Sequence, residues 1–137
     1  MRQATIMEQY EELPEDIERV AAAIVDSAYA VHRALGPGLL ESVYEVCLAY
    51  ELKKRGLHVQ TQLVLPITYS GVQLDAGLRL DLLVDEKVIV ELKAVEKFLP
   101  IHRAQVLTYL KLTKYRLGLL INFNVPLIKE GIKRVIL

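Results

Sequence analysis

The stretch that decides the fold of this 137-residue chain is Asp81-Leu-Leu-Val-Asp-Glu-Lys-Val-Ile-Val-Glu91-Leu92-Lys93. Its apolar runs are typical of buried β-strands, but charges interrupt them. Arg79 and Asp81 break the first run, and Glu91 and Lys93 break the second. Charged side chains seldom lie in buried strands unless they are paired or bind a metal. Metal-assisted phosphodiester hydrolysis needs such a pattern, because carboxylates hold a divalent cation while a lysine supports the attacking water and the developing negative charge.

The spacing of the two acids constrains the hairpin between them. For Asp81 and Glu91 to share a face of the sheet, the strands must pair so that partner numbers sum to 172. A two-residue turn at Asp85-Glu86 gives an odd sum and sends the acids to opposite faces. We therefore predict a three-residue connection, residues 85–87, or a bulge in one strand.

Hydrophobic periodicity and turn residues predict the element order ααβββαββ. Pro66 within the first strand predicts a sheet edge or a bulge, and Ser70-Gly71 predicts a hairpin turn. The sequence thus predicts an α/β fold, a mixed central β-sheet flanked by helices, in a single domain of residues 13–137 after a flexible acidic lead of residues 1–12. The predicted ranges are helices 14–35, 39–55 and 101–114 and strands 58–69, 72–84, 87–95, 116–123 and 132–137.

Composition sets mild bounds. No apolar run approaches the roughly 18–20 residues that span a bilayer, so no membrane association is expected. The single cysteine, Cys47, excludes an internal disulfide, and the acidic N-terminus is not a secretory signal, which together favour the cytoplasm. The net charge of zero hides an acidic segment, residues 1–18, and a body with a net charge of +5 (16 bases and 11 acids). Such a body is compatible with nucleic-acid binding but does not require it.

The second predicted helix carries acids near its apolar face. Glu41 projects inside the apolar arc, and Glu45 lies at its edge. A carboxylate in the first helical turn can simply be favoured by the helix dipole. Alternatively, Glu41, rather than Glu45, points at Asp81 and Glu91 and adds a third carboxylate to an oxygen-rich metal site. The residues assigned to the apolar arc are Leu40, Val43, Tyr44, Cys47, Leu48 and Leu52.

The third predicted helix has a polar face formed by His102, Gln105 and Tyr109, on the side away from Leu107 and Leu110. Gln105 and Tyr109 are four residues apart and can pair as surface neighbours without any function. Alternatively, this face lies against the site, with Gln105 positioning the lysine and Tyr109 reaching a phosphate. His102 is expected to be a peripheral or substrate-contacting residue, because hard divalent cations prefer oxygen ligands.

Two sets of motifs resemble known families. Gly38-Leu-Leu-Glu41-Ser-Val-Tyr44 is similar to the GxxExxY signature of a family of small bacterial and archaeal proteins. Asp81, Glu91-Leu-Lys93 and Gln105-Val-Leu-Thr-Tyr109 resemble the PD-(D/E)XK nuclease superfamily, in which that family is placed. The resemblance covers residues 16–137; one departure is Leu80, which precedes the acid where the motif has proline.

The resemblance implies a restriction-endonuclease-like core with Asp81 and Glu91 as metal ligands and Lys93 as the catalytic lysine. It also implies that Glu41 is the helical acid and that Gln105 and Tyr109 form an auxiliary pair. We expect Mg²⁺ or Mn²⁺ to bind Asp81, Glu91, Glu41 and the main-chain carbonyl of Leu92, while Lys93 orients or deprotonates the attacking water. Tyr44 and His102 complete the candidate substrate-binding residues.

The leading hypothesis is therefore a metal-dependent nuclease, with DNA favoured over RNA. A first alternative is a nuclease-fold module that binds nucleic acid or a protein partner without cutting. A second is a structural ion-pair ladder across the strands. The ladder would consist of Arg79, Asp81, Glu91 and Lys93. Because so small a chain offers little surface to grip a duplex, a homodimer or a partner protein also remains open.

Overall fold

A computed structural model describes residues 13–137, and the expected lead, residues 1–12, lies outside the described part. The predicted order ααβββαββ is confirmed, with one short 3₁₀ turn, η1, added before the last strand. Within the described residues, no helix is long and apolar enough to cross a membrane. The elements are α2 (Glu15–Leu35), α3 (Glu41–Lys54), β1 (Val59–Tyr69), β2 (Val72–Val84), β3 (Val88–Lys93), α4 (Pro100–Thr113), β4 (Leu117–Asn122), η1 (Ile128–Gly131) and β5 (Ile132–Ile136).

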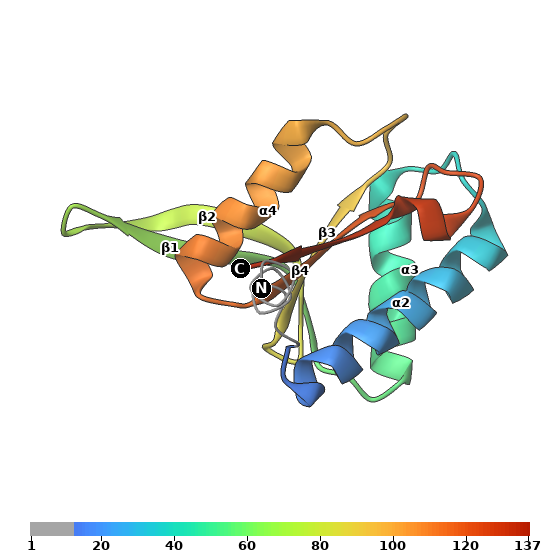
Figure 1. Cartoon of the computed structure of the whole chain (residues 1–137), viewed down its shortest axis with the longest axis horizontal. Coiled ribbons are helices and arrows are strands. Elements are labelled where there is room, and N and C mark those ends of the chain that lie inside the picture. Colours follow the sequence, from blue (N-terminus) through green and yellow to red (C-terminus); the bar gives the residue numbers. More distant parts are fainter. Residues whose placement is uncertain (1–12) are drawn as a thin grey trace, which may run out of the picture.

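The five strands form one mixed sheet in the order β1-β2-β3-β4-β5. All neighbours are antiparallel except β3 and β4, which are parallel. A parallel pair needs a crossover connection, and α4 supplies it between these two strands. Helices α2 and α3 cover one face of the sheet and α4 covers the other (Figure 1). The predicted mixed sheet flanked by helices is thus confirmed.

The core lies on both faces at the centre of the sheet, where successive residues of a strand point to opposite sides. Val90 and Ile121 pack in the cluster formed with α2 and α3. Ile89 and Leu120 pack in the cluster formed with α4. Because both faces are covered, β3 and β4 are almost continuously apolar, and a charged residue within them needs a specific reason to be there.

The hairpin between β2 and β3 has the predicted register. Leu82 pairs with Val90, Leu83 with Ile89 and Val84 with Val88, so the residue numbers of each pair sum to 172. Residues 85–87 form the three-residue connection, in which Asp85 and Glu86 have φ values of 51° and 53°. The connection therefore has the length that allows Asp81 and Glu91 to meet.

The hairpin of β1 and β2 extends beyond the rest of the sheet as a two-stranded arm (Figure 1). Ser70 and Gly71 form its turn with φ values of 52° and 82°, as expected for a tight hairpin. Strand β1 is an edge strand, and its register shifts between Leu65 and Ile67. Both outcomes predicted from Pro66, an edge strand and a bulge, are present.

Helix α3 buries most of the predicted arc: Tyr44, Leu48 and Leu52 are fully buried, and Cys47 packs half-buried against the core. Ala49 is buried, whereas Leu40 and Val43, which were assigned to the apolar arc, are 73% and 37% exposed. The prediction was wrong for Leu40, Val43 and Ala49, because α3 carries apolar residues nearly all round and packing on the sheet and on α2 selects which of them are buried. Glu45, predicted at the edge of the arc, lines the same cavity beside the sheet as Glu41.

Candidate active site

The candidate site is built where strands β2 and β3 separate. Backbone pairing stops after Leu82 and Val90, because β2 continues beside β1 while β3 continues beside β4. The next two residues in register are Asp81 and Glu91. The backbone N–H of Asp81 donates to Glu91 Oε2 at 2.8 Å, and the N–H of Leu92 donates to Asp81 Oδ2 at 2.9 Å. The two carboxylates thus satisfy donors that the diverging strands leave unpaired, and this holds them side by side.

Glu91 is almost completely buried, with 3% of its surface exposed. Desolvation, followed by the negative charge of Asp81, raises its pKa to about 8. The hydrogen bond from Asp81 and the positive charge of Lys93 lower its pKa but do not offset the first two effects. At neutral pH this carboxyl group therefore tends to hold a proton, unless a cation stabilises the ionised form.

The raised pKa of Glu91 predicts how stability depends on pH in the absence of metal. The unfolded chain releases this proton near the ordinary pKa of 4.5, whereas the folded chain holds it to about pH 8. Stability should therefore fall as pH rises between these values, by a few kcal/mol in total, and level off above them. Thermal melts from pH 5 to pH 9 should show a fall that is smaller in Glu91→Gln. Equal slopes in the two proteins would contradict the assignment.

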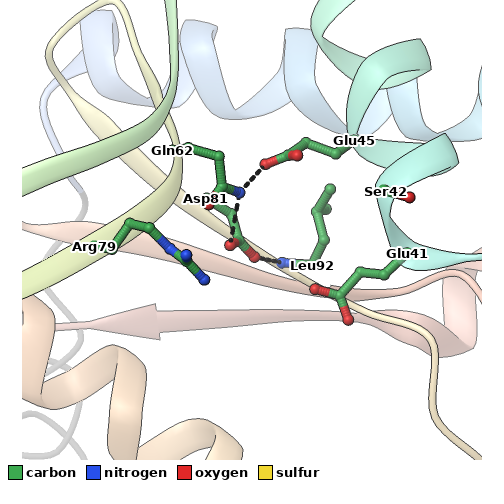
Figure 2. A pocket seen from close by; sticks show the side chains of 7 residues that line it. All are labelled: Glu41, Ser42, Glu45, Gln62, Arg79, Asp81 and Leu92. Carbon is green, nitrogen blue, oxygen red and sulfur yellow. Dashed lines mark hydrogen bonds between the residues drawn. The ribbon is translucent and has the colours of Figure 1, made fainter.

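A cavity of about 260 Å³ opens beside Asp81 (Figure 2). Glu41 and Glu45 both line it from α3. The lining of the cavity therefore does not distinguish Glu41, which was predicted to point at the strand acids, from Glu45. Desolvation and the charge of Asp81 raise the pKa of Glu41, and Lys93 lowers it. Glu45 instead reaches Asp81 through the amide of Gln62. The residues that line the cavity are Glu41, Ser42, Glu45, Gln62, Arg79, Asp81 and Leu92.

The donor set suits a hard divalent cation only in part. Asp81 and Glu91 supply two neighbouring carboxylates, and desolvation makes a positive partner favourable for Glu91. Within residues 13–137, however, no three Asp, Glu, His or Cys side chains are arranged so that they alone could hold a metal ion. Mg²⁺ commonly binds one or two carboxylates and completes its shell with water and substrate phosphate. The residues present fit that mode of binding rather than an all-protein cage.

Lys93 lies between the acids and helix α4. It lines a second cavity, of about 470 Å³, together with His102, Gln105 and Tyr109. The amide of Gln105 donates to the hydroxyl oxygen of Tyr109 at 3.1 Å. Desolvation and the charge of Glu91 raise the pKa of Tyr109, so this hydroxyl lies within electrostatic reach of the buried acid. The predicted polar face of α4 therefore both pairs internally and faces the site.

His102 has a local structural contact as well. Its Nδ1 accepts a hydrogen bond from the backbone N–H of Leu99 at 3.0 Å, at the N-terminus of α4. Its ring lies edge-on to Phe98, with the centroids 6.2 Å apart. The side chain thus anchors the start of the helix that presents Gln105 and Tyr109, at the rim of the cavity shared with Lys93.

The structural ion-pair ladder is not present. Salt bridges within residues 13–137 join Arg19 to Glu15, Arg55 to Glu51 and Arg134 to Glu18. None of them involves the four charged residues of β2 and β3. Ion pairs between neighbouring strands therefore do not explain why these charged residues lie in β2 and β3.

Tyr44 does not occupy the predicted substrate-binding position. Its side chain is fully buried and stacks on Phe123, with the ring centroids 4.6 Å apart. Its hydroxyl donates to the carbonyl of Gly36 at 2.6 Å and accepts from the N–H of Leu39 at 3.1 Å. Tyr44 therefore fixes the loop that leads into α3 and thereby the position of Glu41, because a buried hydroxyl must find partners within the fold.

Asn122 and Gln62 support the site but were not predicted from the sequence to do so. Asn122 is 2% exposed; its Oδ1 accepts from the N–H of Val95 at 3.1 Å and its Nδ2 donates to the Val95 carbonyl at 2.8 Å. It thus holds the chain two residues beyond Lys93. An amide at the end of an otherwise apolar strand was a usable signal for Asn122. Gln62 gave none, because it stands among the polar positions of a half-exposed strand.

The sequence matches the profile of the PD-(D/E)XK nuclease superfamily over residues 18–135, which include every residue of the candidate site. No curated protein and no solved structure gives a significant match. The matched range extends from α2 to β5 and thus covers the whole sheet and the fork that carries the acids. The chain belongs to the PD-(D/E)XK nuclease superfamily.

Proposed function

We propose that this protein is a metal-dependent nuclease that hydrolyses phosphodiester bonds. The observation that carries the proposal is the fork between β2 and β3, where the carboxylates of Asp81 and Glu91 meet through reciprocal backbone contacts. Lys93 follows two residues later on the same strand and lines the adjoining cavity. Membership of a nuclease superfamily supports the same reaction class.

Asp81, Glu91 and the main-chain carbonyl of Leu92 are the proposed metal ligands, with Glu41 as a further carboxylate at the cavity. A bound Mg²⁺ or Mn²⁺ would polarise the phosphate and lower the pKa of a water molecule. Lys93 would hold the attacking water and stabilise the charge that develops on the phosphate oxygens. A charged ammonium donor suffices for this role, and general-base action would require that Lys93 be deprotonated.

The remaining roles follow from position. Gln105 and Tyr109 line the Lys93 cavity, and we assign Gln105 to positioning the lysine and Tyr109 to a phosphate oxygen. His102, at the rim, is a candidate substrate contact. Arg79 is exposed and lines the acid cavity, so its guanidinium is available to an incoming phosphate.

Two finer assignments belong to this proposal. Placement in the GxxExxY family rests on Gly38, Glu41 and Tyr44, whereas the preference for DNA over RNA rests on the resemblance to the PD-(D/E)XK nucleases. The buried position of Tyr44 gives that signature a physical meaning, since the tyrosine orders the loop that presents the glutamate.

A metal-dependence screen tests the proposal. We expect the full chain to cleave at least one substrate among linear, nicked, branched and single-stranded DNA and RNA in the presence of Mg²⁺ or Mn²⁺. Cleavage should stop when a chelator is added. Calorimetric titration with Mn²⁺ should show binding by the wild type and none by Asp81→Ala, because the variant removes a proposed ligand.

The outcomes separate the alternatives. Metal binding together with nucleic-acid binding, but without cleavage of any substrate, would favour the module that binds without cutting. Absence of Mn²⁺ binding by the wild type, across pH 6 to pH 9, would contradict the proposed metal site itself.

A further inference from the structure

Gln62 has a backbone conformation that is rare in a β-strand. Its φ of 49° lies in the left-handed region, although it stands inside β1. The ladder pairs Thr61 with Leu82 and Leu63 with Leu80, and it leaves Gln62 opposite Asp81 without a backbone pair. A non-glycine residue keeps such a conformation only where its surroundings hold it there, and such residues concentrate at functional sites.

The side chain of Gln62 lies between two carboxylates (Figure 2). Its amide nitrogen donates to Glu45 Oε1 from α3 and to Asp81 Oδ1, the latter at 3.4 Å. The second oxygen of Asp81, Oδ2, accepts from the N–H of Leu92. Each oxygen of Asp81 therefore has one donor from the protein, and the two donors together define the orientation of the carboxylate plane.

We propose that Gln62 is a positioning residue that Glu45 holds in place and that orients Asp81 for a divalent cation. The inference rests on the proposed metal-dependent function and deepens it. An amide suits this position because it has two N–H groups, one for each carboxylate, and adds no charge. The negative charge of Asp81 thus remains available to the cation. Outer-shell partners of this kind typically contribute ten- to hundredfold to metal affinity.

The test is the Mn²⁺ affinity of Gln62→Gly, measured by calorimetry on the full chain above pH 8. We expect binding to weaken about ten- to hundredfold. The metal-free melting temperature should stay near that of the wild type, because glycine adopts a positive φ without steric cost. Ser70→Gly is the matched control: Ser70 also has a positive φ, 52°, but it lies in the hairpin turn. It should bind Mn²⁺ like the wild type.

Variants of Glu45 test whether the effect of Gln62 on metal binding depends on its hydrogen bond to Glu45. Glu45→Ala should weaken Mn²⁺ binding as much as Gln62→Gly, and the double variant should be no weaker than either single one, because both remove the same support. Glu45→Gln should retain most of the affinity, since its carbonyl oxygen can still accept the hydrogen bond from Gln62.

Three results would overturn the inference. Wild-type affinity in Gln62→Gly would show that Asp81 needs no support, and it would leave the proposed metal site intact. An equal loss in Glu45→Gln and Glu45→Ala would show that Glu45 acts through its charge. A wild type that binds no Mn²⁺ would overturn both this inference and the proposed function, and this outcome is recognised without any variant.

Discussion

Replacing Lys93 by methionine should lower the rate of phosphodiester cleavage by roughly a hundred- to ten-thousandfold while Mn²⁺ binding persists. Methionine keeps much of the length and apolar packing of lysine but removes the ammonium group that we assign to the attacking water and to the phosphate charge. Single groups that act by proton transfer or by electrostatic stabilisation of the transition state contribute factors of this size. The measurement is a cleavage time course beside a calorimetric Mn²⁺ titration of the same preparation.

The pH of this comparison matters. The positive charge of Lys93 lowers the pKa of Glu91, so its loss should make Glu91 harder to ionise and weaken metal binding near neutrality. Both measurements therefore belong above pH 8.5. Lys87→Met is the matched control, because Lys87 lies in the turn at the other end of β3. Cleavage by Lys93→Met within a fewfold of this control would show that the lysine has no catalytic role.

The second large effect concerns the carboxylates. Glu91→Gln should fold with a stability equal to or above that of the wild type when metal is absent, most clearly at and above pH 8. The amide keeps the shape and an oxygen that accepts the hydrogen bond from Asp81, and it removes the buried charge and its repulsion with Asp81. The same variant should lose the rise in melting temperature that Mg²⁺ or Mn²⁺ gives the wild type.

Asp81→Asn should lose the metal effect as well, with a smaller gain in stability. Asp81 accepts one hydrogen bond on each oxygen, from Gln62 and from the N–H of Leu92, whereas asparagine has only one acceptor oxygen, so one of these two donors must lose its partner. Thermal melts with and without metal give both comparisons. Amide variants that melt far below the wild type without metal would identify Asp81 and Glu91 as structural residues, and the nuclease proposal would lose its main support.

The element order and the pairing of the acids were accessible from the sequence because both follow local rules. Side chains alternate along a strand, so the numbers 81 and 91 already required the even register and the three-residue turn that β2 and β3 show. Pro66 likewise marked an edge strand with a bulge. These features depend on residues close together in the chain, and tertiary contacts did not override them.

The surroundings of the acids were not accessible in this way. Helical periodicity in α3 placed Val43 within the buried arc and Glu45 at its edge. The helix is apolar on several sides, however, and packing against the sheet and α2 buries Ala49 rather than Val43. Tyr44 matched a signature associated with function, yet its ring is in the core. Which face of a helix is buried depends on partners that are distant in sequence, and periodicity within the helix cannot reveal them.

The sequence by itself determined that two strands carry acids in phase, followed by a lysine, within a sheet covered on both sides. Only the tertiary structure decided how those acids meet. Strand β2 stays paired with β1 while β3 stays paired with β4, so the two strands separate. This fork leaves two backbone N–H groups unpaired, and the carboxylates of Asp81 and Glu91 accept hydrogen bonds from them. The amide of Gln62 reaches the same place from β1. Strand partners far apart in the chain create this fork, so no local pattern of residues could have predicted it.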